Sequence, residues 1–244
     1  FGNANYDVLA DLTSGEEFEP VGNPDIRPER TVQYQFGYRQ IVNEWVGLDV
    51  NAFYKDIRDL IGTEFIYTYN DALYSRLANV DFGNVLGFTV SMDHRPRGLF
   101  SMAIDYTWQT AHGNASDPRE TANLAENGQD PRPAEVPLNW DQRHTLNITA
   151  SVARPGSFAT NAVLRLGTGQ PFTPELRESD DEIERNSGRK PFAALLDLRG
   201  EKSFKPAGVD ATVFLRVFNA LDTRFFNGFV FASSGSPDYS KTPQ

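Results

Sequence analysis

The sequence lacks several kinds of residue and segment that would carry chemistry. It has no cysteine, which excludes disulfide bonds, thiolate metal sites and cysteine nucleophiles. No segment approaches the roughly 18 consecutive apolar residues of a membrane-spanning helix, and the mean hydropathy is -0.47. Lys and Arg number 23 against 33 Asp and Glu, which gives a net charge of -10. Because no basic stripe is present, the chain is not expected to bind nucleic acid.

Aromatic side chains are plentiful instead, and they alternate with polar ones. They make up 12% of the 244 residues, with 18 Phe and 9 Tyr. Between Phe100 and Trp108 each even-numbered side chain is large and apolar, and each odd-numbered one is small or polar. Successive side chains of a strand lie on opposite faces, so residues 99–108 predict a strand with one apolar and one wet face. The segment also has about the length (~9–11 residues) that a tilted strand needs to cross a bilayer.

The same alternation recurs along most of the chain. Tight Pro/Gly turns follow some of these segments, and long polar stretches follow others, notably 109–139 and 167–191. Bacterial outer-membrane barrels alternate short periplasmic turns with long outer loops in this way. The further segments that predict strands are 31–39, 46–55, 87–93, 145–152, 158–166, 194–201 and 209–217, with a weaker one at 225–232.

Three architectures are compatible with this alternation. In a transmembrane barrel the apolar set faces lipid and the polar set faces a wet lumen. A small complete outer-membrane barrel, either a pore or a hydrolase, is the second possibility. A soluble β-sandwich binding module is the third, and its apolar faces would pack against each other. In the barrel, the predicted lumen-facing side chains are Arg39, Asp105, Arg165, Asp197, Arg199, Glu201 and Arg216.

Five short fragments resemble strand boundaries of TonB-dependent receptors. Their order and spacing also resemble that family, although Thr89 stands where the family usually has an acidic residue. The fragments are residues 23–29 (NPDIRPE), 54–61 (YKDIRDLI), 79–90 (NVDFGNVLGFTV), 141–146 (DQRHTL) and 214–222 (FLRVFNALD).

The resemblance implies an all-β fold, an antiparallel up-and-down transmembrane β-barrel. About eight or nine strands are expected here, out of roughly 22 in the largest barrels of this kind, so the sheet should be open and curved. Residues 1–244 are expected to form a single region of that barrel, with the N-terminal plug domain absent and no aromatic residue at the end of the chain, which closes on Gln244.

The resemblance also implies a place and a task. It implies the bacterial outer membrane and energy-coupled uptake of a scarce ligand, with the siderophore, cobalamin, glycan and peptide classes all open. The implied partners are outer-membrane lipid, the missing plug domain, the TonB energy-coupling protein acting through that missing part, and a small extracellular ligand.

Catalytic chemistry is not expected. Asp141, Arg143 and His144 would suit a hydrolase in their residue types, but no serine has a recognisable nucleophile context. We expect these three residues to form hydrogen bonds where a strand leaves an outer loop.

No metal or cofactor is expected either. His94 and His112 lack the spacing of a zinc motif. Six carboxylates lie within residues 175–184, but their spacing fits no EF-hand calcium loop, so a solvated acidic loop is the prediction.

Overall fold

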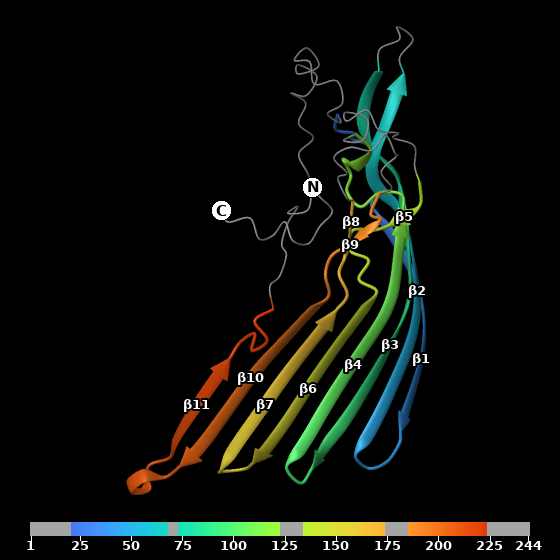
Figure 1. The fold of residues 1–244 in the computed structure, drawn as a ribbon. Coiled ribbons are helices and arrows are strands. Elements are labelled where there is room, and N and C mark those ends of the chain that lie inside the picture. Colours follow the sequence, from blue (N-terminus) through green and yellow to red (C-terminus); the bar gives the residue numbers. More distant parts are fainter. Residues whose placement is uncertain (1–20, 68–72, 123–133, 174–184, 224–244) are drawn as a thin grey trace, which may run out of the picture. The chain divides into compact units, whose positions relative to one another are not determined.

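The computed structural model describes residues 21–67, 73–122, 134–173 and 185–223. Nearly all regular structure in them is strand, and none of their helical turns is long and apolar enough to span a membrane. A short 3-10 turn, η2 (Pro206–Gly208), precedes the last strand. The strands are β1 (Arg30–Ile41), β2 (Val46–Tyr67), β3 (Leu73–Arg97), β4 (Phe100–Gly113), β5 (Val136–Pro137), β6 (His144–Arg154), β7 (Phe158–Gly167), β8 (Pro171–Phe172), β9 (Gly188–Arg189), β10 (Ala193–Phe204) and β11 (Ala211–Val217) (Figure 1).

Nine of these strands form one sheet. Its order is β1-β2-β3-β4-β6-β7-β10-β11, with β5 added beside β4, while β8 and β9 form a separate two-stranded sheet. Consecutive long strands therefore pair with each other, as in an up-and-down meander. Within the described residues β1 and β11 each pair on one side only, so the sheet is open. The prediction of an antiparallel all-β fold that forms part of a barrel is confirmed.

The cross-strand register confirms the alternation of faces. We call the face that holds the even-numbered residues of β4, β6, β7 and β10 and the odd-numbered residues of β11 the apolar face, and its opposite the polar face. Residues that pair directly share a face. One row on the apolar face consists of Ile104, Ile148, Leu164 and Leu196. One row on the polar face consists of Ser101, Ser151, Asn161, Arg199 and Arg216.

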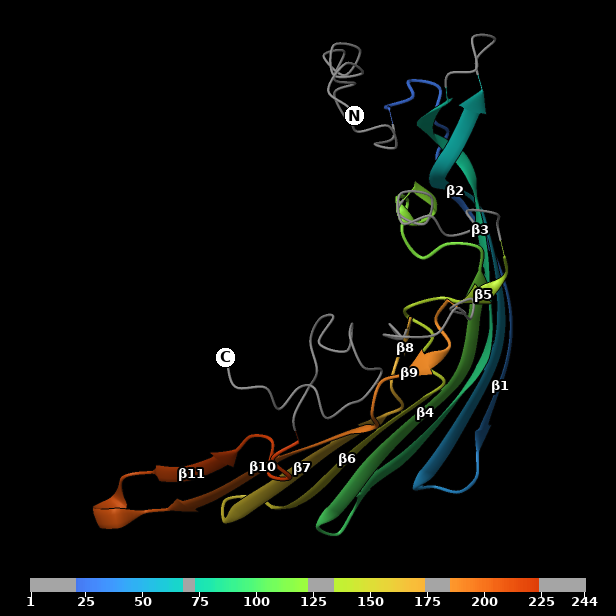
Figure 2. The same ribbon diagram turned by 45° about the horizontal axis from the view of Figure 1, so that its top comes forward.

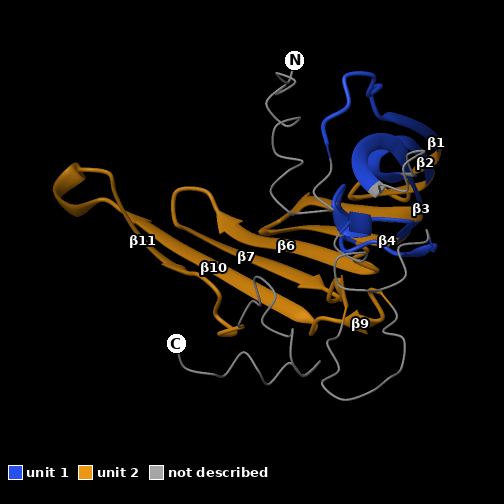
Figure 3. Cartoon of the chain, turned by 90° about the horizontal axis from the view of Figure 1, so that it is seen from above, with its two compact units in different colours: residues 1–34, 54–85, 111–140 blue, residues 35–53, 86–110, 141–244 orange. Residues whose placement is uncertain are grey.

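The chain divides into two compact units. Unit 1 comprises residues 1–34, 54–85 and 111–140, and unit 2 comprises 35–53, 86–110 and 141–244 (Figure 3). Unit 1 has a small buried core that includes Val85, Ala111 and Leu138, at 3%, 0% and 1% exposure. Unit 2 contains most of β4 together with β6, β7, β10 and β11, which run side by side (Figure 2).

The apolar face of unit 2 has no protein layer over it among the described residues. Val213 and Leu215 on that face are 61% and 69% exposed, and Val152 and Leu198 are also exposed. Monomeric proteins in water rarely display a continuous apolar surface of this kind, whereas a bilayer solvates it. A β-sandwich needs a second sheet against this face, and the described strands supply none.

Two strands are longer than the sequence pattern indicated. Alternation predicts strands ending near residue 55 and starting near 87, with a mixed segment over 56–78 in which residues 64–69 are a candidate extension of the hairpin. Instead, β2 continues to Tyr67 and β3 begins at Leu73. The extension is stabilised across the hairpin, for example by an ion pair between Arg76 and Glu64 at 3.1 Å. Alternation weakens here because both faces of these extensions carry polar side chains. The weaker segment at 225–232 lies outside the described residues.

Asn79 joins three of the sequence fragments within unit 1. Its Oδ1 accepts a hydrogen bond from the backbone N–H of Arg27 at 2.8 Å. Its Nδ2 donates to the carbonyl oxygens of Arg27 at 2.9 Å and Asp59 at 2.7 Å. Asp59 has a φ of 59°, in the left-handed region. The side chain of Asn79 therefore fixes an extended segment against a strained position of β2.

Replacing Asn79 with alanine should lower the free energy of unfolding by about 1–3 kcal/mol, because backbone groups lose their partners. The matched control is Asn84→Ala in the same strand. Asn84 makes one long contact, to Glu135 at 3.5 Å, so a change within about 0.5 kcal/mol is expected. Denaturant unfolding of the natural full-length protein measures both. An equal decrease in the free energy of unfolding in the two variants would show that Asn79 has no special structural role.

Candidate functional site

The predicted lumen-facing residues make polar contacts across neighbouring strands. On β1, the guanidinium of Arg39 forms an ion pair with Asp49 of β2 at 2.6 Å. On β4, Asp105 accepts a hydrogen bond from the hydroxyl of Ser91 on β3 at 2.7 Å. Both contacts are solvent-exposed, so they organise a wet surface and add little stability.

The other five residues gather on β7, β10 and β11. Arg165 lies 3.5 Å from the carboxylate of Asp197, and the backbone N–H of Asn219 donates to the same carboxylate at 2.9 Å. Arg199 forms an ion pair with Glu201 at 2.8 Å. Residues two apart on one strand share a face, so the odd-numbered residues of β10 from Asp197 to Glu201 necessarily form one charged strip.

Arg199 and Arg216 lie directly opposite each other in the β10–β11 pair. Like charges in that position repel, and aromatic rings offset the repulsion. The guanidinium of Arg199 lies 5.8 Å from the ring centre of Phe214, and that of Arg216 lies 5.6 Å from Phe218. Among the described residues Arg216 has no carboxylate partner. It is therefore a cation available to an incoming anionic group.

Sequence analysis did not single out the two phenylalanines of this cluster. Phe214 lies on the polar face with Arg216, and Phe218 directly follows β11 with its ring beside Arg216; the two are 64% and 67% exposed. Each phenylalanine lies two residues from Arg216, and this spacing could have assigned both to the same face as Arg216. Simple alternation misses them because it assigns phenylalanine to the apolar face. The arginines explain their position, because a ring face attracts a guanidinium.

A shallow hollow of about 420 Å³ lies over this cluster. Ligand sites that bind tightly are more enclosed and mostly apolar. This hollow instead offers both charges and an aromatic ring to solvent, which suits transient contact with a polar solute. Its lining includes Asn161, Asp197, Arg199, Glu201, Arg216 and Phe218.

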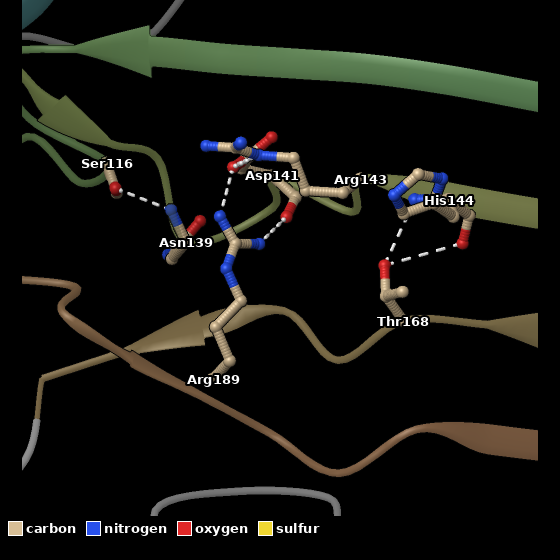
Figure 4. A network of polar contacts seen from close by, with 7 residues as sticks. All are labelled: Ser116, Asn139, Asp141, Arg143, His144, Thr168 and Arg189. Atoms are coloured by element: carbon tan, nitrogen blue, oxygen red, sulfur yellow. Dashed lines mark hydrogen bonds and ion pairs between the residues drawn. The ribbon is translucent and has the colours of Figure 1, made fainter.

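A second polar cluster lies just before the start of β6, where Asp141 is fully buried and bonded to two arginines (Figure 4). Arg143 Nε lies 3.0 Å from its carboxylate, and Arg189 Nη2 lies 2.6 Å from the same oxygen. Arg189 Nη1 also donates to the carbonyl oxygen of Asp141 at 2.7 Å. Because Arg189 belongs to β9, the cluster ties the β8–β9 hairpin to the start of β6. Sequence analysis did not single out Arg189.

His144 forms the hydrogen bonds that were expected where the strand begins. Its backbone N–H donates to Thr168 Oγ1 at 3.0 Å, and its carbonyl oxygen accepts from the N–H of Thr168 at 3.0 Å. Its Nδ1 lies 2.8 Å from the hydroxyl of Tyr106. Figure 4 also draws a separate contact within unit 1, from the N–H of Asn139 to Ser116 Oγ at 3.0 Å.

The described residues contain no group of three or more His, Asp or Glu arranged to hold a metal ion. His94 packs against the ring of Phe100 at 5.5 Å, with its Nδ1 buried and unpaired. His112 pairs with Pro137 between β4 and β5. The acidic segment 175–184 lies outside the described residues.

Comparison with known families identifies the fold. The family model for "TonB dependent receptor-like, beta-barrel" matches residues 2–220. The chain therefore belongs to the TonB-dependent receptor β-barrel family, and its place is the bacterial outer membrane. A search of curated proteins finds no match.

Solved structures with the same fold are distant in sequence. The outer membrane transporter YddB from Escherichia coli is 13% identical with a TM-score of 0.62, over 83% of this chain and 30% of that one. The ferric-catecholate import receptor Fiu from E. coli is 15% identical with a TM-score of 0.53, over 82% and 24%. The FrpB iron transporter from Neisseria meningitidis is 13% identical with a TM-score of 0.53, over 83% and 29%. The chain thus spans less than a third of the length of these proteins.

Proposed function

We propose that this chain is one section of the barrel wall of a receptor that imports a scarce small ligand across the outer membrane. In this proposal residues 1–244 are a single region of the barrel, and a plug domain lies elsewhere in the natural protein. The TonB protein supplies energy through that plug. The observation that carries the proposal is the division of one uncovered sheet into an apolar and a charged face.

The charged face is the proposed lumen wall. Arg39, Asp105 and the cluster on β7, β10 and β11 place charges of both signs along it. Such a surface holds water and passes polar solutes without retaining them. The hollow beside Arg199 and Arg216 is the part of the wall that we propose touches the ligand.

We also propose that the chain is not an enzyme. The ring of His144 is engaged by the hydroxyl of Tyr106. Asp141 is held by two guanidinium groups in a buried position. These contacts favour a structural role for both residues over general acid–base catalysis.

The two alternatives are less well supported. A small stand-alone barrel would join its first and last strands, whereas β1 and β11 are both edges among the described strands. A soluble sandwich would bury the apolar face that includes Val213 and Leu215.

The test is uptake by bacteria that produce the natural full-length protein as their only receptor of this kind. The first probe is a labelled ferric siderophore, because Fiu and FrpB are described as iron importers. Labelled cobalamin, a glycan and a peptide follow. Uptake of one probe is expected, and it should disappear in cells without TonB. Uptake of none of the four, or uptake that persists without TonB, contradicts the proposal.

The double variant R199A/R216A should reduce uptake of that probe at least tenfold, since even one lost charged hydrogen bond costs about 1.5–3 kcal/mol and about 1.4 kcal/mol is a factor of ten. The control is Lys205→Gln, which removes a cation already paired with Asp210 at 3.0 Å outside the hollow. Uptake by the control should stay unchanged. Unchanged uptake by the double variant would exclude the hollow as a ligand contact.

A further inference from the structure

The apolar face carries two formal charges, and both are positive. In β4, β6, β7, β10 and β11 they belong to Arg154 and Lys202, and every other side chain on this face is uncharged. The polar face of the same strands mixes both signs, as at Asp197 and Arg199. Both charges on the apolar face are cations, although acidic residues outnumber basic ones in the chain, 33 to 23.

The two cations lie in a single cross-strand row. Phe158 of β7 pairs with Arg154 on one side and with Lys202 on the other. Arg154 and Lys202 are exposed, and Phe158 is half-buried between them. Two strand spacings separate the cations by about 10 Å. Their long apolar stems extend along the sheet surface, so both heads can reach one group above Phe158.

In the part of the chain that the structure describes, Arg154 and Lys202 have no carboxylate partner. Nearby Lys205 differs, because it forms an ion pair with Asp210 at 3.0 Å. The row therefore presents a local excess of positive charge at the edge of an apolar surface.

The position of this row along the strands corresponds to one surface of a membrane. His144 and Arg154 bound β6 and lie ten residues apart on the same face. That separation is about 33 Å along the strand, or about 25 Å along the membrane normal at a tilt of about 40°, the height of a barrel's apolar band. His144 pairs with Trp108, in the aromatic belt position. Arg154 then lies at the opposite surface, beside the tight turns that face the periplasm.

We propose that Arg154 and Lys202, with Phe158 between them, bind the phosphate of an anionic phospholipid in the periplasmic leaflet. The two cations hold the phosphate, and Phe158 packs against the glycerol and upper acyl carbons. The site faces lipid rather than the lumen, so it is separate from the ligand contacts proposed above and holds whether or not those are correct.

Native mass spectrometry of the natural full-length protein, in detergent with added lipid, tests this proposal. Phosphatidylglycerol should be retained in preference to zwitterionic phosphatidylcholine at equal concentration. The double variant R154Q/K202Q should bind phosphatidylglycerol about 30-fold more weakly, since each surface cation contributes about 1 kcal/mol towards an anionic lipid. If the double variant fails to fold, as shown by gel mobility before and after boiling, R154Q and K202Q singly should each weaken binding about fivefold.

The matched control is R95Q/K205Q. It removes two positive charges from the same end of the sheet, Arg95 near the end of β3 and Lys205 just after β10, and leaves the row intact. Lipid retention should therefore equal that of the unmodified protein. Equal retention by R154Q/K202Q and the unmodified protein would overturn the proposal. So would equal affinity for the two lipids. Displacement of the lipid by inorganic phosphate at the same concentration would assign the site to free phosphate instead.

Discussion

Replacing Ile104 with arginine is expected to lower the free energy of unfolding in phospholipid vesicles by about 2–4 kcal/mol. Ile104 pairs with Ile148 in the middle of the apolar face, about halfway between the rows of His144 and Arg154. A guanidinium there meets acyl chains, and its stem is too short to carry it to either surface without distortion. Equilibrium unfolding of the natural full-length protein from vesicles gives the value.

The matched control is Ala103→Arg, one residue earlier on the same strand. Ala103 pairs with Thr149 on the polar face, so the same charge should meet water and cost less than about 1 kcal/mol. Asp105→Leu tests the faces in the other direction and should also be mild. Should Asp105→Leu prove as harmful as Ile104→Arg, the assignment of the two faces would be wrong.

Replacing Asp141 with asparagine is expected to release the β8–β9 hairpin and to lower stability by about 2 kcal/mol. The change keeps the shape and removes the charge that two arginines share at 2.6 and 3.0 Å. Breaking a fully buried ion pair costs about 3–5 kcal/mol. The loss should be smaller here because the arginine side chains are 36% and 33% exposed, which allows water to solvate them.

Hydrogen exchange and protease cleavage of the natural protein measure the release. Backbone amides near Lys190, whose N–H bonds to Gln170 at 3.0 Å, should exchange faster in Asp141→Asn. The control is Asp105→Asn, where an exposed carboxylate accepts a hydrogen bond from Ser91. Asp105 belongs to β4, which does not pair with β8 or β9. Exchange near Lys190 that is the same in all three proteins would show that Asp141 does not anchor the hairpin.

The strands that cross the apolar band were predictable from the sequence, and the reason is physical. A bilayer accepts apolar side chains on one face only, so β4 and β6 carry strict alternation that a period of two detects. β2 and β3 were cut short because their outer parts lie beyond that constraint, where the Arg76–Glu64 ion pair stabilises the hairpin instead. Pattern alone has no signal for such pairs.

The candidate site was predictable as a face but not as a cluster. Alternation assigned Arg199, Arg216 and Asp197 to one face. The further statement that this face lines a lumen stays a prediction. The register that sets Arg199 opposite Arg216 depends on the length of the β10–β11 turn, which only the structure fixes. Phe214 was missed because its partner is a cation on another strand. Arg189 was missed because β9 is two residues long and too short to show a period.

The order of strands in the sheet determines the order in which they can be added during folding. Each long strand of the described sheet pairs with its neighbours in the sequence. The pairs β6–β7 and β10–β11 close over short turns, whereas residues 114–143 separate β4 from β6 and residues 168–192 separate β7 from β10. These two steps close larger loops, at an entropic cost that grows only slowly with loop length. The strands can therefore be added one hairpin after another to a growing sheet. A growing sheet of this kind offers one advancing edge. Where a short turn follows, as after β6 and β10, the next strand is tethered beside that edge, which limits the time during which the edge can pair with another molecule.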